Sequence, residues 1–177
     1  MTVLIVPHDP NWARAFSNEA AAIVNCVQDV GLKLHHIGST AVHGLLAKPI
    51  IDLLGEVKDA ASLDRLVGIE GLGYEAMGAF GIEGRRYFRK INAAGKRTHH
   101  LHIFEHGSPN VERHIAFRDY LRAHDDIAAQ YGALKVQLTS EKVPEWDGYV
   151  DGKSPFVRRV ERDALAWYRN VNGSSSQ

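Results

Sequence analysis

The chain has 177 residues, of which 45% are hydrophobic and 24% charged, a composition typical of a globular protein with its own core. Its 21 Lys and Arg residues equal its 21 Asp and Glu residues, so no overall charge favours nucleic acid or an anionic membrane as a partner. A lone cysteine, the lack of a membrane-length apolar run and the lack of a secretory leader pattern predict one cytoplasmic domain over residues 1–177.

Helix and strand patterns alternate in the first part of the chain, up to about residue 106. Asp9 and Pro10 are typical of a helix start, and the apolar stripe that follows predicts a helix ending at Gly31. A short amphipathic helix is predicted after the second strand. The strands themselves are predicted at residues 32–37, 50–57, 74–79, 86–92 and 98–105.

The last third of the chain, about residues 107–170, is predicted to be helical. Helix starts are indicated at Ser108 and near Asp125, and a final helix covers about residues 145–170. Pro155 lies inside that last helix and is expected to kink or divide it, because proline removes a backbone donor and clashes with the preceding turn. The order of elements predicts an α/β (α+β) fold class with a helical C-terminal third.

A carboxylate interrupts the second predicted strand. Asp52 stands among isoleucines and leucines, where a buried charge is costly unless it is paired, hydrogen-bonded or bound to a metal. The turn Gly38-Ser39-Thr40 precedes this strand, and such a turn brings backbone donors and hydroxyls close to a phosphate. Asp52 could then hold a divalent cation against that phosphate. The alternative is structural, with Asp52 accepting hydrogen bonds from the turn or pairing with Lys48.

Histidines on the fifth predicted strand form a second polar feature. His100 and His102 are two residues apart, so their side chains point to the same face of a strand. Two such histidines and an aspartate from a neighbouring strand can chelate one ion, which predicts Asp52, His100 and His102 as ligands of a divalent metal (Mg, Mn or Zn). His36, just before the turn, is expected to face the same pocket. The alternative is that these histidines are hydrogen-bonded polar residues on a half-buried sheet face.

Basic residues form a third feature. Arg86 lies in a cluster of arginines and lysines ahead of the histidine strand, and arginine can clamp phosphate with two donors. Tyr149 and Lys153 are i, i+4 in the last helix and can reach one cleft. The alternative for the cluster around Arg86 is that it forms a solvated surface. The alternative for Tyr149 and Lys153 is that they pack between helices. The predicted phosphate-binding residues are therefore Gly38, Ser39, Thr40, Lys48, Arg86 and Lys153.

Several segments, in the same order and with similar spacing, carry a family resemblance. They are VPHDPNWARAF, HIGSTAVHGLLAKPIIDLL, GRRYFRK, RTHHLHIFEHGSP, RHIAFRDYLRAH and YGALK. From about Val6 to beyond Lys153, the chain resembles the GrpB family. The resemblance implies a nucleotidyltransferase-type mixed sheet flanked by helices, similar to the domain appended to some bacterial dephospho-CoA kinases. Active members of that superfamily carry a Gly-Ser turn followed by a strand with two metal-binding carboxylates.

The chain departs from this pattern at one position. Leu54 stands where the second carboxylate would be, and Glu56 lies a further pleat along, about 13 Å from Asp52. We expect a pocket for a phosphate-bearing small molecule or nucleotide, with Asp52 and His102 as catalytic residues if metal-assisted nucleotidyl transfer takes place. The alternative is a non-catalytic ligand-binding or adaptor domain that has lost the carboxylate pair.

Overall fold

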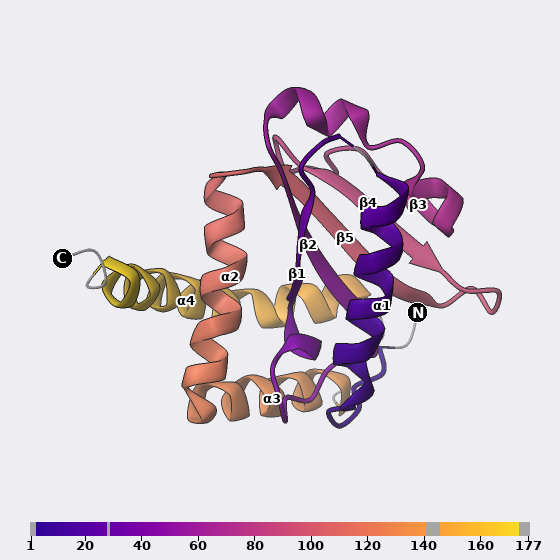
Figure 1. Cartoon of the computed structure of the whole chain (residues 1–177). Coiled ribbons are helices and arrows are strands. Elements are labelled where there is room, and N and C mark those ends of the chain that lie inside the picture. Colours follow the sequence, from indigo (N-terminus) through magenta and orange to yellow (C-terminus); the bar gives the residue numbers. More distant parts are fainter. Residues whose placement is uncertain (1–2, 28, 141–145, 174–177) are drawn as a thin grey trace.

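Five strands form one mixed sheet in the computed structural model of the chain, which describes residues 3–27, 29–140 and 146–173. The strand order is β1-β2-β5-β4-β3 (Figure 1); β2 and β5 are parallel, and the other neighbouring strands are antiparallel. The strands are β1 Lys33–Ile37, β2 Ile51–Val57, β3 Tyr74–Ala76, β4 Arg86–Ile91 and β5 Arg97–Glu105. The α-helices are α1 Asn11–Cys26, α2 Pro109–Ala123, α3 Asp125–Ser140 and α4 Trp146–Gly173.

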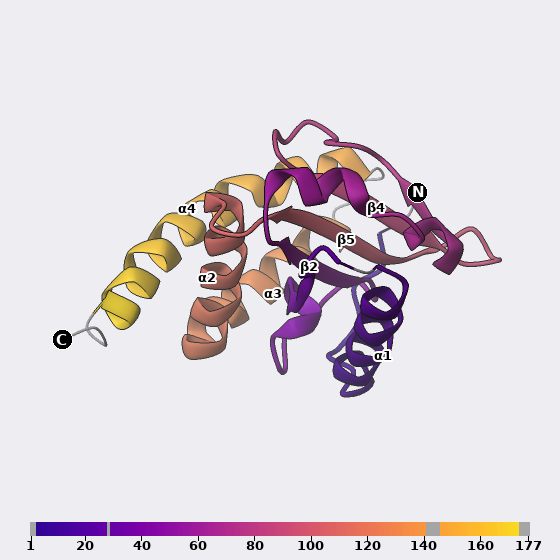
Figure 2. The same ribbon diagram turned by 45° about the horizontal axis from the view of Figure 1, so that its top comes forward.

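Two helical segments differ from the sequence-based expectation. After β2 the chain forms two 3-10 turns, Ala60–Arg65 and Ile69–Leu72, in place of one amphipathic helix. Gly68, at φ +101°, takes the left-handed conformation that ends a helix, so the two turns cannot join. In contrast, α4 continues through Pro155 undivided, and Figure 2 shows it curving along its length. Its packing against both α2 and α3 holds the two halves in place.

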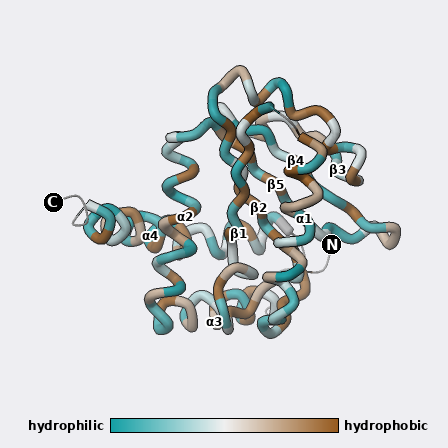
Figure 3. Tube along the Cα trace, viewed as in Figure 1, coloured by the Kyte–Doolittle hydropathy of each residue, from teal (hydrophilic) through white to brown (hydrophobic). Residues whose placement is uncertain are grey.

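The main hydrophobic core lies between α1 and one face of the sheet. Ile23 of α1 is fully buried in the same cluster as Leu53 of β2 and Leu101 of β5. Because strand side chains alternate, Asp52 and His100 point to the opposite face. Figure 1 shows α1 in front of the sheet with α4 behind it, and in Figure 3 hydrophobic residues gather where β2 and β5 run behind α1.

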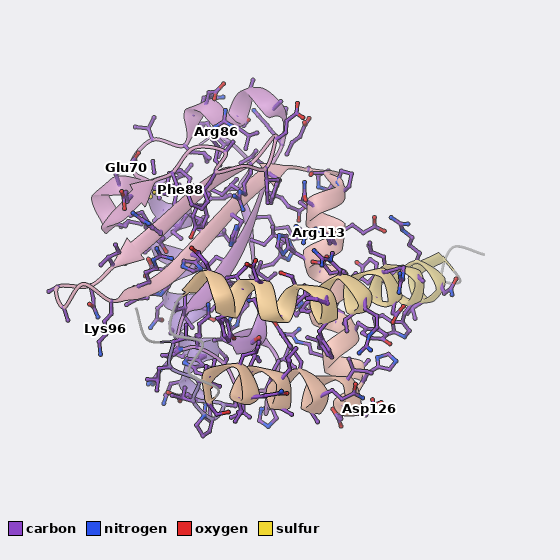
Figure 4. All side chains as sticks on the ribbon, turned by 180° about the vertical axis from the view of Figure 1, so that it is seen from behind. Glu70, Arg86, Phe88, Lys96, Arg113 and Asp126 are labelled. Atoms are coloured by element: carbon purple, nitrogen blue, oxygen red, sulfur yellow. The ribbon has the colours of Figure 1, made fainter. Side chains whose placement is uncertain are left out.

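The C-terminal helices cover the other face of the sheet. Leu54 and Phe104 pack with Val111 of α2, and a second cluster, including Leu45 and Val160, joins the helices to the segment after β1. Figure 4, drawn from behind, shows α4 crossing in front of one end of the sheet. No helix within the described ranges is both long enough and apolar enough to span a membrane. The α/β architecture with a helical C-terminal part is therefore as predicted.

Candidate functional site

A cavity of about 250 Å³ lies between the sheet and the C-terminal helices. The turn after β1, the starts of β2 and β5, and all three C-terminal helices contribute to its wall. The structure thereby brings together eight of the nine residues that the sequence suggested for one site. They are Gly38, Ser39, Thr40, Lys48, Asp52, His100, His102 and Lys153.

Arg86, the ninth, lies outside this cavity. It pairs in register with Ile103, whose side chain belongs to the core on the α1 side, so alternation along β4 turns Arg86 away from the cavity. Its Nη2 donates a hydrogen bond to Asp64 Oδ1 at 2.6 Å. Figure 4 places Arg86 at the end of the molecule away from α4. The structure therefore does not support Arg86 as a phosphate ligand of this site; the alternative of a surface residue fits it better.

His36 also differs from the expectation that it faces the cavity. It lies on the α1 side of the sheet, where its ring stacks on Phe16 with 4.8 Å between ring centroids. Its Nε2 lies 2.9 Å from the hydroxyl of Thr40. His36 therefore supports the turn from behind instead of lining the cavity.

The turn after β1 is held tightly against Asp52. Gly38 has φ +72°, in the left-handed region that favours glycine, and a Cβ there would lie 2.6 Å from Asp52 Oδ2. Two arginines of α2 fix the backbone on either side of the turn. Arg118 Nη1 donates to the carbonyl of His36 at 3.1 Å, and Arg122 Nε donates to the carbonyl of Ala41 at 2.9 Å. The turn and the carboxylate are thus positioned as one unit.

Asp52 is an ionised carboxylate held by a histidine. His100 Nδ1 lies 3.2 Å from Asp52 Oδ1. Burial alone would raise the pKa of Asp52, but the hydrogen bond from His100 and the nearby His102 and Lys48 lower it to about 2. The partner of Asp52 is therefore mainly an imidazole, with Lys48 contributing through its charge.

The side chains beyond Asp52 on the same face of β2 do not reach the cavity. Leu54 is fully buried in an apolar cluster beneath α2. Glu56 lies further along β2, where its two oxygens contact His35 Nε2 at 2.6 Å and His106 Nδ1 at 2.9 Å. Asp52 is consequently the one carboxylate among the cavity residues that the structure describes.

The predicted metal ligands are close together but are not arranged around a common point. The rings of His100 and His102 are 6.4 Å apart, and His102 stacks on Tyr87 with a centroid distance of 5.0 Å. Within the described ranges, no group of three or more His, Cys, Asp or Glu side chains is placed to hold a metal ion. A single carboxylate does not fit a two-metal site. Metal binding by Asp52, His100 and His102 stays a prediction, and we derive no chemical step through a metal.

Three lysines on separate segments converge on the cavity: Lys48 before β2, Lys135 on α3 and Lys153 on α4. Two of them contact the same aromatic ring: the Nζ atoms of Lys48 and Lys153 are each 5.2 Å from the centroid of Tyr149. Lys135 Nζ lies 4.2 Å from the centroid of the Tyr131 ring. Each ammonium therefore faces an aromatic ring at cation–π distance.

Lys135 is the most deeply buried of the three lysines, with 2% of its surface exposed. Its Nζ donates to Ser39 Oγ at 2.9 Å and to the carbonyl of Leu46. Burial, reinforced by the charges of Lys153 and Lys48, lowers its pKa to about 7. The hydroxyl of the predicted phosphate-binding turn is thus joined directly to a lysine of α3.

Tyr131 and Lys135 are not among the residues predicted from the sequence, although the sequence holds a signal for them. They have the i, i+4 spacing that singled out Tyr149 and Lys153, so Tyr-x-x-x-Lys occurs once in α3 and once in α4. Such spacing places both side chains on one face of a helix. Two helices that each turn this face to the sheet supply two tyrosine–lysine pairs to one cavity.

A family model described as GrpB protein matches residues 2–163. The chain belongs to the GrpB family. It is 39% identical over 176 residues to UPF0157 protein YqkA of Bacillus subtilis (strain 168), covering 97% of the chain and 51% of YqkA, so it spans about half of that relative. It is 28% identical over 193 residues to a dephospho-CoA kinase of Mycolicibacterium paratuberculosis, covering 93% of the chain and 46% of the kinase. The predicted family and its relation to dephospho-CoA kinases are confirmed.

Two solved structures have a fold similar to that of this chain. The crystal structure of conserved protein GrpB from Enterococcus faecalis has a TM-score of 0.86 and 42% identity to this GrpB-family chain, covering 93% of the chain and 99% of that protein. Cid1 in complex with its short product ApU has a TM-score of 0.51 at 12% identity, covering 82% of the chain and 48% of Cid1. The predicted nucleotidyltransferase-type fold is confirmed at this level.

Proposed function

We propose that this GrpB-family protein binds a phosphate-bearing small molecule, with a nucleotide as the first candidate. The observation that carries the proposal is the convergence of Lys48, Lys135 and Lys153 on a cavity where Asp52 is the one carboxylate among the described lining residues. Buried like charges repel one another and lose hydration unless an anion compensates them. A phosphate group brings the required negative charge and several acceptor oxygens.

The turn at Gly38-Ser39-Thr40 favours a phosphate over a carboxylate as the anionic group of the ligand. Ser39 already contacts Lys135, so the hydroxyl and the ammonium are adjacent donors. At Gly38 the space of a Cβ is taken by Asp52 Oδ2, so what the turn offers a phosphate is the Ser39 hydroxyl beside Lys135. Cid1, which shares the fold, has been solved with ApU and, at a TM-score of 0.50, with Mg 3′-dATP bound. These likenesses favour a nucleotide among phosphate compounds.

Nucleotidyl transfer is the reaction to test first once a nucleotide binds. Asp52 is ionised and lies in the same cavity, so it could accept a hydrogen bond from an acceptor hydroxyl and orient it. The apolar environment of Leu54 favours the second candidate, a binding or adaptor role without turnover. Pyrophosphate release that disappears in Asp52→Asn, with the melting temperature retained, would support transfer. Nucleotide binding without pyrophosphate release would support the binding role.

Removing one cavity lysine is expected to weaken phosphate binding by roughly tenfold or more, the value of one charge-assisted hydrogen bond. The variant is Lys153→Gln, and affinity is measured by calorimetry with ATP, GTP, CTP, UTP and inorganic tripolyphosphate on protein without a histidine tag. Arg158→Gln is the matched control, because Arg158 is an exposed cation on the same helix. The proposal is wrong if none of these compounds binds or if both variants have the same effect.

As pH rises, phosphate affinity should fall while the stability of the ligand-free protein should increase. Burial is the main cause that lowers the pKa of Lys135 to about 7 and that of Lys48 to about 8, so phosphate affinity should fall as pH rises through about 7–8. In the unfolded chain lysines keep a pKa of about 10.4 and bind more protons than in the fold, so stability of the ligand-free protein should rise between about pH 7 and 10.

Urea unfolding and calorimetry across this pH range check both trends. The wild type is compared with Lys135→Met, which keeps an unbranched side chain one atom shorter and removes the charge, so the difference isolates Lys135. If the differences in stability and in phosphate affinity between the wild type and Lys135→Met do not change with pH, Lys135 is not the group that titrates.

A further inference from the structure

The loop between β3 and β4, residues 77–85, turns one aromatic side chain outward. Phe80 has φ +44°, a left-handed value that is rare for a bulky residue and costs conformational energy. The residue is also 61% exposed. A large apolar ring that is both strained and exposed contributes little to the core, so its conformation needs another explanation.

The rest of this loop is firmly attached. Arg85, itself buried, donates from Nε to the carbonyl of Ala79 at 3.0 Å and from Nη2 to the carbonyl of Phe80 at 2.6 Å. Ile82 packs against the apolar cluster around Leu54 on the cavity side of the sheet. The exposure of Phe80 is therefore imposed by a clamped backbone and is not a result of weak attachment.

Aromatic rings connect Phe80 to the wall of the cavity. The centroid of its ring lies 5.4 Å from the centroid of the Tyr87 ring. Tyr87 in turn lies 5.0 Å from the His102 ring and 5.8 Å from the His100 ring, and both histidines line the cavity. Phe80 thus stands one ring beyond the cavity wall, with its own surface open to solvent.

The size of the cavity leaves a nucleotide partly outside. At about 250 Å³ the cavity is below the roughly 300–1,000 Å³ that drug-sized ligands occupy, so a nucleotide whose phosphates lie among the lysines must extend past the rim. A nucleobase is flat and apolar on its faces and stacks on exposed aromatic side chains. Phe80, in the loop ahead of β4, offers such a surface one aromatic ring beyond the lining histidines.

We propose that Phe80 is the stacking surface for the base of a nucleotide whose phosphates are bound by Lys48, Lys135 and Lys153. This inference rests on the proposed function and narrows its ligand class from phosphate compounds to nucleotides. Stacking recognises the aromatic face, so the contribution of Phe80 is similar for different bases. A phosphate compound without a ring gains nothing from this residue.

The test is Phe80→Gly, because glycine adopts the left-handed conformation without strain. Stability in urea should stay equal or increase. Affinity for the tightest binder among ATP, GTP, CTP and UTP should fall roughly tenfold, while affinity for inorganic tripolyphosphate stays unchanged. Phe80→Trp should preserve nucleotide affinity. Val67→Ala is the control, since Val67 is 76% exposed and lies between the two 3-10 turns after β2.

A second measurement needs no variant. The fluorescence of 2-aminopurine riboside triphosphate is expected to be quenched on binding to the wild type, because stacking quenches this base. Equal nucleotide affinities for the wild type and Phe80→Gly, or the absence of quenching, would overturn the inference while leaving tripolyphosphate binding as support for the proposed function. If neither nucleotides nor tripolyphosphate bind the wild type, both proposals fall.

Discussion

Replacing Leu54 with aspartate is expected to destabilise the protein by about 4 kcal/mol or more, and not to restore a metal-binding carboxylate pair. Leu54 has 0% of its surface exposed and belongs to an apolar cluster with Ile37, Phe104 and Val111. A carboxylate in this cluster would lose its hydration, and the cluster has no charged member. The cross-strand neighbours of Leu54 are His35, which already contacts Glu56, and His102, which stacks on Tyr87. The apolar packing beneath α2 therefore makes the position unsuitable for an acid.

Leu54→Met is the matched control, because it keeps the side-chain volume and apolar character and should cost less than about 1.5 kcal/mol. Urea unfolding at neutral pH, with circular dichroism to follow helix content, compares the two variants. A well-folded Leu54→Asp protein that gains stability on addition of Mg²⁺, Mn²⁺ or Zn²⁺ would show that the site accepts a second carboxylate after all.

Gly38→Ala is expected to destabilise the protein by about 3 kcal/mol and to weaken phosphate binding with it. Two costs combine at this position: alanine is strained at φ +72°, and its Cβ would lie 2.6 Å from Asp52 Oδ2. Something must then move, and the carboxylate that faces His100 is the nearest group. We expect the turn and Asp52 to separate, which would disturb the floor of the cavity.

Gly44→Ala is the comparison for these two costs. Gly44 has a similar φ of +78°, but no atom lies within 4 Å of the position where its Cβ would be. The difference in unfolding free energy between the two alanine variants therefore includes the contact with Asp52 and the strain of an alanine at the Gly38 backbone angles, φ +72° and ψ −171°. In a double-mutant cycle, Asp52→Ala should recover part of the stability lost in Gly38→Ala. If Asp52→Ala recovers none of the stability lost in Gly38→Ala, the close approach of the carboxylate costs nothing.

The sequence by itself determined the fold, because the signals for it are local. Short apolar runs and period-two patterns mark the strands, and the two-residue spacing of His100 and His102 places both on one face of β5. That Asp52 shares this face follows only from the pairing of β2 with β5. The segments that resemble the GrpB family cover most of the chain, and the family model confirms them. The turn at Gly38 and its relation to the next strand also follow from neighbouring residues, so these parts of the site could be predicted.

The tertiary structure alone decided which side chains share the cavity. Arg86 was predicted as a phosphate ligand and Lys135 was not, yet Arg86 faces away from the cavity on β4 and Lys135 contacts Ser39 from α3. The periodicity of a segment shows which of its residues lie on the same face of that helix or strand. It does not show which other helix or strand packs against that face. That choice depends on how α3 and α4 pack across the sheet, and this packing brings three lysines to one carboxylate, Asp52.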